Sequence, residues 1–227
     1  MCEVWEADYS RPVSRFASLS KLATAWPASA QDWDQEFWLN QRFSFSLSQT
    51  TFARIQFLQG ANDNVSHLFN TFAEVNVGFH VRPWLTLMPG FRHDRLDPFG
   101  QNSRFEHRPQ FALILQTSRG RWRPNLRFQV EGRFLRDEPW ILRFLPQPGV
   151  EYAVSSYKDR PVAFYLTNEF AFDSRTDRYS RNRLQVGIAL PATPTLSIVP
   201  SYMIESIRAA GVWDHDSVWG LSLWWRL

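Results

Sequence analysis

Apolar and polar residues alternate along the chain from about residue 33 to its end. In the segment 33–47, Phe37, Leu39, Phe43 and Phe45 share one parity, and polar residues such as Arg42 occupy the other. A period of two places successive side chains on opposite faces of a β-strand, whereas a helix would repeat every 3.6 residues. The pattern therefore predicts strands, each with one apolar and one polar face.

Eleven segments with this period can be counted. They cover residues 33–47, 51–60, 67–81, 84–95, 104–117, 123–136, 140–154, 161–173, 179–190, 194–206 and 216–227. Turn-forming residues separate them, as at Arg119-Gly120 and Pro191-Ala192-Thr193-Pro194. Short connections alternate with longer ones, which is typical of antiparallel strands running up and down in one sheet. We expect one all-β domain.

Two architectures share this alternation and differ in which face points inward. A soluble barrel or sandwich keeps its apolar face inside, whereas an outer-membrane barrel turns that face to lipid and keeps a polar interior. Many of the segments run to 12–15 residues, long enough to cross a bilayer at a tilt. Closure would also remove the sheet edges that a meander leaves exposed.

The distribution of charged and aromatic residues favours the membrane arrangement. Away from the segment ends, the apolar faces carry no Asp, Glu, Lys or Arg, as a lipid-facing surface requires. Tryptophan and tyrosine gather at segment ends, where an interfacial girdle would place them. These residues are Trp33, Trp84, Trp122, Trp140, Tyr157, Trp213 and Trp219.

Composition narrows the class further. Lys+Arg 25 against Asp+Glu 22 gives a net charge of +3, and only Lys21 and Lys158 are lysines. Soluble β-proteins usually place lysine on exposed sheet edges, and this chain hardly uses it. The small positive excess contains no basic cluster that would indicate nucleic-acid binding. The single Cys2 excludes a disulfide framework, and no apolar run is long enough for a transmembrane helix.

Several short motifs occur in a characteristic order between residues 33 and 227. They are Trp38-Leu39, Glu106-His107-Arg108, the run from Leu126 to Phe134 (LRFQVEGRF), Leu142-Arg143-Phe144, Asn168-Glu169-Phe170, Asn182-Arg183-Leu184 with Gly187, and Ser201-Tyr202-Met203. This set resembles a bacterial family catalogued only as a domain of unknown function, whose members look like outer-membrane β-barrels. The resemblance implies a barrel in the outer membrane of a diderm bacterium, surrounded by lipid, and implies no activity.

The two ends of the chain depart from that pattern. Barrels of this class end on an aromatic residue that the barrel assembly machinery recognises in the C-terminal strand; here Trp225 precedes the final Leu227 by two. Ala28-Ser29-Ala30 has the small-x-small form of a signal cleavage site, although the first eight residues are acidic. We expect residues 1–30 to hold the remnant of an export signal and residues 31–227 to form the barrel; a disordered cytosolic extension is the alternative.

Strand number is constrained by the fold class. Single-chain bacterial barrels have even numbers of strands, so eleven segments predict ten or twelve strands, with twelve favoured. The segment 140–154 contains Pro146 and Pro148, and proline is poorly tolerated inside a strand ladder. That segment is therefore the one most open to miscounting.

Arginine and glutamate recur on the polar faces, where they would line the barrel interior. These residues are Glu36, Arg42, Arg54, Glu74, Arg92, Glu106, Arg108, Arg127, Glu131, Arg133, Arg143, Glu151, Glu169, Arg183, Glu205 and Arg226. They either border a narrow aqueous pathway with mixed charge or cross-link neighbouring strands in a filled interior. The near balance of the two types favours cross-linking, and we expect a structural protein or a narrow passive pore.

Two other functions stay open. A lipid-modifying hydrolase would need a nucleophile and a base, for which His215-Asp216-Ser217 and Ser66-His67 are candidates. The chain lacks a Gly-x-Ser-x-Gly elbow, so we expect no enzyme and no cofactor. Metal-ligand spacing is absent from the sequence, with His80, His93 and His107 interpreted as polar-face or strand-end residues. A soluble barrel that binds an apolar ligand would invert every face, and the sequence names no ligand.

Overall fold

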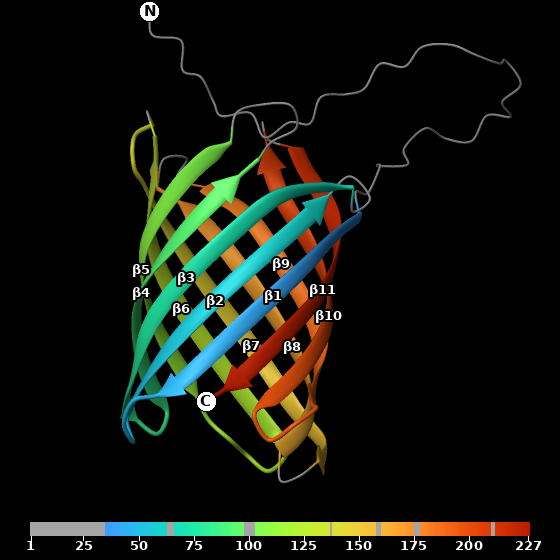
Figure 1. Ribbon diagram of the computed structural model, residues 1–227. Coiled ribbons are helices and arrows are strands. Elements are labelled where there is room, and N and C mark those ends of the chain that lie inside the picture. The colour runs from blue at the N-terminus through green and yellow to red at the C-terminus, as the bar shows by residue number, and fades with distance from the viewer. Residues whose placement is uncertain are drawn as a thin grey trace, which may run out of the picture.

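The computed structural model describes residues 35–62, 66–97, 103–136, 138–157, 160–174, 178–209 and 212–227. Over these residues the chain forms eleven strands arranged as a barrel (Figure 1). The strands are β1 (Gln35–Ser46), β2 (Thr51–Asn62), β3 (His67–Arg82), β4 (Leu85–Leu96), β5 (Arg104–Gln116), β6 (Trp122–Leu135), β7 (Ile141–Tyr157), β8 (Arg160–Asp173), β9 (Arg178–Pro191), β10 (Leu196–Ala209) and β11 (Val212–Arg226). The proposed signal remnant, residues 1–30, and the first four residues of the expected barrel, 31–34, lie outside the described residues.

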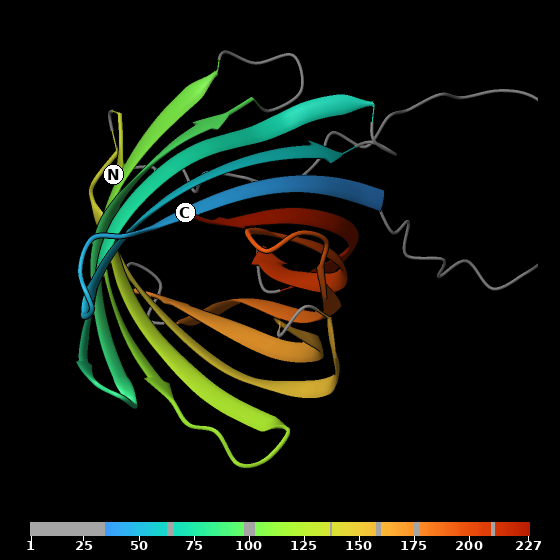
Figure 2. The same cartoon turned by 60° about the horizontal axis from the view of Figure 1, so that its bottom comes forward.

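Consecutive strands pair antiparallel, and β1 closes the barrel by pairing with β11 (Figures 1 and 2). This closing pair is parallel, from Gln35↔Ser217 to Ser44↔Arg226. An odd number of up-and-down strands makes the first and last run in the same direction, so a parallel pair is the geometric consequence. The all-β barrel expected from the sequence is confirmed within the predicted range of ten to twelve strands. The structure has eleven strands in its described part, and the favoured twelve and the even-number rule do not hold there.

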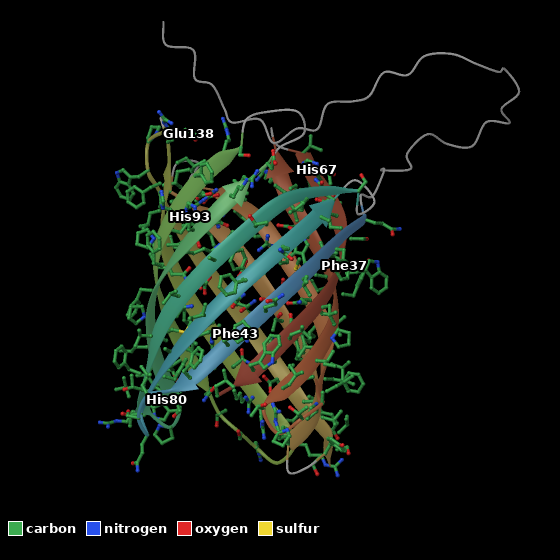
Figure 3. All side chains as sticks on the ribbon, in the orientation of Figure 1. Phe37, Phe43, His67, His80, His93 and Glu138 are labelled. Carbon is green, nitrogen blue, oxygen red and sulfur yellow. The ribbon has the colours of Figure 1, made fainter. Side chains whose placement is uncertain are left out.

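The strand register sorts side chains into an inward and an outward set. Arg42 pairs with Gln56 on β2, Gln56 pairs with Glu74 on β3, and Glu74 pairs with Arg92 on β4. Such rows run around the barrel, so the polar parity of each strand meets the polar parity of the next. Phe37, of the opposite parity, points away from the barrel (Figure 3).

Over the middle of the described strands the outward set is mostly apolar and carries no Asp, Glu, Lys or Arg. Exposed large side chains include Phe57, Val75, Phe111, Phe128 and Val186. Outward-pointing arginines such as Arg82, Arg95 and Arg208 lie only at strand ends. The interior accordingly holds the charged and amide side chains together with apolar ones such as Met88 and Leu145, and an apolar surface lies outside. This arrangement is the reverse of the one that a soluble barrel for an apolar ligand requires.

Strand β7 is continuous through its two prolines. Pairing with β6 runs through Pro146 and Pro148, whereas the pairing with β8 is interrupted between Phe144 and Gly149. Proline lacks the N–H that a ladder needs, so the loss is confined to one side of the strand. The segment suspected of miscounting is therefore one strand.

Aromatic residues mark both ends of the barrel. Trp84, Trp122 and Tyr157 lie at the lower end of Figure 1, where Leu227 also lies, and Trp140 and Trp213 lie at the upper end, where β1 begins. Trp219 lies within β11 and pairs with Phe37, and Trp33 is outside the described residues. None of the described residues belongs to a helix with the length and hydropathy needed to cross a bilayer.

Candidate functional site

The register places every predicted interior residue on the inward face. Eight of the predicted interior residues are buried: Glu36, Glu106, Arg108, Glu131, Arg133, Arg143, Glu169 and Glu205. The remaining predicted residues are Arg42, Arg54, Glu74, Arg92, Arg127, Glu151 and Arg183, which are half-buried, and Arg226, which is exposed at the lower mouth. Alternation along each strand brings these side chains together from all sides of the barrel.

One cluster of charges forms around Glu106 on β5, toward the upper end. The Glu106 carboxylate is fully buried and accepts hydrogen bonds from the guanidinium groups of Arg133 (Nη2 to Oε2, 2.9 Å) and Arg108 (Nη2 to Oε2, 2.7 Å). Asp94, also fully buried, lies 3.3 Å from Nε of Arg108 and accepts hydrogen bonds from Nε of Arg92 at 2.9 and 3.0 Å. Acidic and basic side chains alternate within this cluster, so each charge has a neighbour of opposite sign.

The same cluster continues through Glu131 to Asp173. Glu131 Oε1 lies 3.7 Å from Nη1 of both Arg108 and Arg143. Arg143 then donates two hydrogen bonds to the Asp173 carboxylate, at 2.6 and 3.0 Å, and Ser180 donates a third at 2.7 Å. The network thereby links β4, β5, β6, β7, β8 and β9 across the interior.

A second cluster lies around Glu169 on β8 and Glu205 on β10. Glu169 accepts hydrogen bonds from Nη2 of Arg127 at 2.8 Å and Nη2 of Arg181 at 2.9 Å. Glu205 accepts one from Nε of Arg183 at 2.9 Å, and that guanidinium carbon lies 4.8 Å from the centre of the Trp38 ring. A guanidinium between a carboxylate and an aromatic face is held from two sides.

Hydrogen bonds between amide side chains connect β3, β5 and β6 at the level of Gly90. Asn76 donates to Glu74 at 2.6 Å and accepts from Gln110 at 3.0 Å, and Gln129 donates to Gln110 at 3.0 Å. Asn76 is on β3 and Gln110 on β5, so their bond crosses β4 above Gly90. A Cβ on Gly90 would lie 1.9 Å from Asn76 Oδ1, and only glycine leaves room for this crossing.

The interior is therefore filled to a large extent by paired side chains. Burying a charge is tolerated when it is paired and hydrogen-bonded, and the carboxylates of Glu106, Asp94, Glu169 and Glu205 satisfy that condition. Glu131 is ion-paired at 3.7 Å, but its Oε1 accepts no hydrogen bond from the described residues. Among the described residues no group of three or more His, Cys, Asp or Glu side chains forms a metal-binding arrangement. The arrangement can cross-link strands and can impose charge selection on a narrow passage.

Several interior residues were missed at the level of sequence. Asp94, Asp173 and Asp216 were not among the interior candidates, yet all three lie in strands on the inward parity, and Asp94 and Asp216 are buried. Arg181 was also absent from the candidates. The sequence could have indicated Asp94 as an interior residue, because it follows Arg92 by two positions in the same strand and therefore shares its face.

The structure places the residues of both candidate catalytic motifs. His215-Asp216-Ser217 lies within β11, so alternation turns Asp216 inward and separates it from His215. His67, which opens β3, lies 2.9 Å from the backbone oxygen of Asp97. The serine that His215 contacts is Ser206 on β10, whose Oγ lies 2.8 Å from Nδ1 of His215.

The remaining histidines occupy both faces. His80 lies inward, with Nδ1 2.9 Å from Thr86 Oγ1. His93 and His107 share the outward parity of Phe91, and their Nδ1 atoms are 3.3 Å apart. These two side chains are therefore on the apolar face, close to the end of β4 and the start of β5, where the sequence interpretation allowed either the polar face or a strand end.

Comparison with known proteins agrees with the resemblance. A protein-family model described as "Protein of unknown function (DUF2490)" matches residues 35–216. This span begins with β1 and ends inside β11, so the match covers nearly the whole barrel. None of the curated proteins matches the chain.

Proposed function

The chain belongs to the DUF2490 family, and from the chemistry of its two faces we propose that it is an outer-membrane β-barrel that serves as a structural protein or a narrow passive pore. The observation that carries the proposal is the separation of charge: paired Arg, Glu and Asp side chains inside, and an apolar exterior whose arginines lie at strand ends. Lipid would cover that exterior, and β11 would be the strand presented to the barrel assembly machinery.

The exposed apolar side chains on the outside of the barrel support a lipid environment on energetic grounds. Side chains such as Phe57, Phe111, Phe128 and Phe164 are 44–50% exposed. A soluble protein rarely exposes a contiguous apolar surface that encircles the molecule, whereas a bilayer requires one. Closure of the barrel satisfies the backbone groups that hydrocarbon cannot.

The interior supports a narrow passage. Glu106, Glu131 and Asp94 are at most 2% exposed, because guanidinium groups from facing strands lie against them. Long side chains can largely fill a barrel of about ten strands. We therefore expect small or rare conductance steps, selected by charge where water passes.

The first experiment tests the compartment and the fold together. Protein recovered from the membrane fraction of an expressing diderm bacterium should require detergent and should migrate faster on a gel when unboiled. A soluble barrel would appear in the aqueous fraction and migrate alike with and without boiling. Planar-bilayer recording of the detergent-purified protein should then show small or rare openings, and large stable openings would contradict the filled interior.

A second candidate function is supported by the contact between Ser206 and His215. The two side chains face outward near the upper end, on neighbouring strands paired at this position. In an acyl-ester hydrolysis, Nδ1 of His215 would take the Ser206 proton as Oγ attacks the ester carbonyl and the alcohol leaves; water would then release the acyl group. An outward dyad at this height would meet lipid ester groups.

Release of fatty acid from phospholipid vesicles containing the purified barrel tests this candidate. Ser206→Ala and His215→Gln should each abolish release, while Ser217→Ala, a serine on the same face whose Oγ contacts Tyr202 at 3.0 Å, should preserve it. Equal release by all variants, or none by the unaltered protein, would leave the passive barrel as the function.

A further inference from the structure

We propose that the lower half of the barrel interior holds a binding site for a small oxyanion, formed by Arg42 on β1, Arg54 on β2, Arg127 on β6 and Trp224 on β11. The inference deepens the proposed pore function, and rests on it only for the consequence that anions would pass in preference to cations. Phosphate, sulfate and small carboxylates share the required chemistry.

The first observation is a set of buried N–H donors without acceptors. Nε of Arg42, Nε of Arg54, Nε of Arg127 and Nε1 of Trp224 are each buried and make no hydrogen bond with any described residue. A buried donor without a partner destabilises the folded protein. A ligand with several acceptor oxygens would satisfy these donors together.

The second observation is that these groups face one another. Arg42 lies beside Trp224, with its guanidinium carbon 4.6 Å from the ring centre, and the two residues are register partners across the closing pair. Arg42 also interacts electrostatically with Arg54 and with Arg127. Arg42 is thus the group that contacts or interacts with each of the other three.

The third observation is an unbalanced charge, unlike that of the two clusters higher in the barrel. Within the described part of the chain, Arg42 and Arg54 form no ion pair, and the acid that faces both is Glu74, whose Oε1 is engaged by Asn76 at 2.6 Å. Arg127 already shares Glu169 with Arg181. Guanidinium groups that repel one another in a poorly hydrated interior are stabilised by an anion among them.

The donors themselves indicate an oxyanion. A guanidinium presents N–H groups in a planar fork that matches two oxygens of a phosphate or carboxylate. An indole N–H adds a neutral donor on one side. Chloride, a spherical acceptor, gains less from this directed arrangement.

The lower mouth would guide anions to this site. Arg123 and Arg226 lie on the inward parity at the lower ends of β6 and β11, and Arg160 wraps this rim by donating to the Thr193 carbonyl at 2.7 Å. Among the described residues at this mouth, the inward-facing acidic residue is Glu151 on β7, the register partner of Arg123. Cations at a mouth raise the local concentration of anions.

Anion-dependent unfolding of the detergent-purified barrel tests the site without assuming any pore activity. Inorganic phosphate or sulfate should raise the unfolding temperature over chloride at equal ionic strength, because a ligand that binds only the folded state stabilises it. Arg42→Gln combined with Arg54→Gln should weaken phosphate binding at least about tenfold, since each lost hydrogen bond involves a charge. Arg95→Gln, an exposed arginine at the upper end, is the matched control and should bind like the unaltered protein.

Trp224→Phe provides a variant that keeps both charges and the aromatic ring. Loss of one neutral N–H donor should weaken phosphate binding about fivefold, and this variant decides the question if the double variant does not fold. Phosphate binding that is absent from the unaltered protein, or unchanged in both variants, would overturn the site. A barrel that binds phosphate yet shows no conductance would retain the site and refute only the pore.

Discussion

The rings of Phe43 and Trp225 stack across the parallel pair that closes the barrel, with centroids 4.5 Å apart and planes 6° from parallel. Both residues are on the outward parity, and they are register partners on β1 and β11. Arg42 and Trp224, the next pair along these strands, contact each other on the inner side. Aromatic contacts thus hold both faces of the one junction that links the first and last strands.

The stacked pair should stabilise closure specifically. We expect Phe43→Ala to lower the free energy of unfolding, of which about 0.5–1.5 kcal/mol reflects the ring contact with Trp225. A double-mutant cycle with Trp225→Ala, measured by urea unfolding in detergent, isolates that contact. Phe111→Ala, an outward phenylalanine on β5, serves as control and should show no coupling to Trp225; equal coupling would contradict a special role for the junction.

The alternation of apolar and polar residues with a period of two was sufficient to predict most of this fold. The segment predicted at 123–136 became β6 (Trp122–Leu135), and that at 67–81 became β3 (His67–Arg82). The inward parity of Glu131 and Arg133 follows from the same alternation, because one face of each strand is chemically uniform. Locally encoded features of this kind are visible in a single sequence.

Features that depend on contacts between distant strands were not visible. The pairing of β1 with β11 depends on how the whole sheet curls, and no local pattern specifies a parallel closure. The crossing of Asn76 and Gln110 above Gly90 joins residues on β3 and β5. Likewise Ser206 and His215 become neighbours only through the register of β10 with β11.

The charge cluster at Glu106 should be sensitive to loss of its acid. Glu106→Gln leaves Arg108 and Arg133 facing a neutral side chain in a buried setting, and removing one partner of a buried ion pair costs about 3–5 kcal/mol. Urea unfolding measures the change. Glu151→Gln is the matched control: Glu151 is half-buried and makes no ion pair within the described ranges, so its loss should cost under about 1 kcal/mol. Similar costs for both would argue against a paired interior.

The close approach at Gly90 gives a steric prediction. Gly90→Ala places a Cβ 1.9 Å from Asn76 Oδ1 and 2.8 Å from the backbone oxygen of Val75, so the Asn76–Gln110 bond must break. We expect a loss of about 1–3 kcal/mol in unfolding free energy. Gly132→Ala, whose nearest neighbour is a Phe134 ring atom at 3.1 Å, should be tolerated better, because that outward ring can move. A larger loss at Gly132 would contradict the amide crossing.

The assignment of the two faces predicts opposite responses at adjacent positions of β6. Phe128 is 46% exposed on the outward face, and Phe128→Arg should block membrane assembly, because arginine at mid-bilayer costs about 2–4 kcal/mol. Phe128→Leu is the control and should assemble. Arg127→Gln, one residue away on the inner face, should also assemble, since Glu169 keeps the hydrogen bond from Arg181 at 2.9 Å. Heat-modifiability after expression, or folding into vesicles, reports assembly; blockage by Arg127→Gln and tolerance of Phe128→Arg would invert the faces and remove the basis for a membrane barrel.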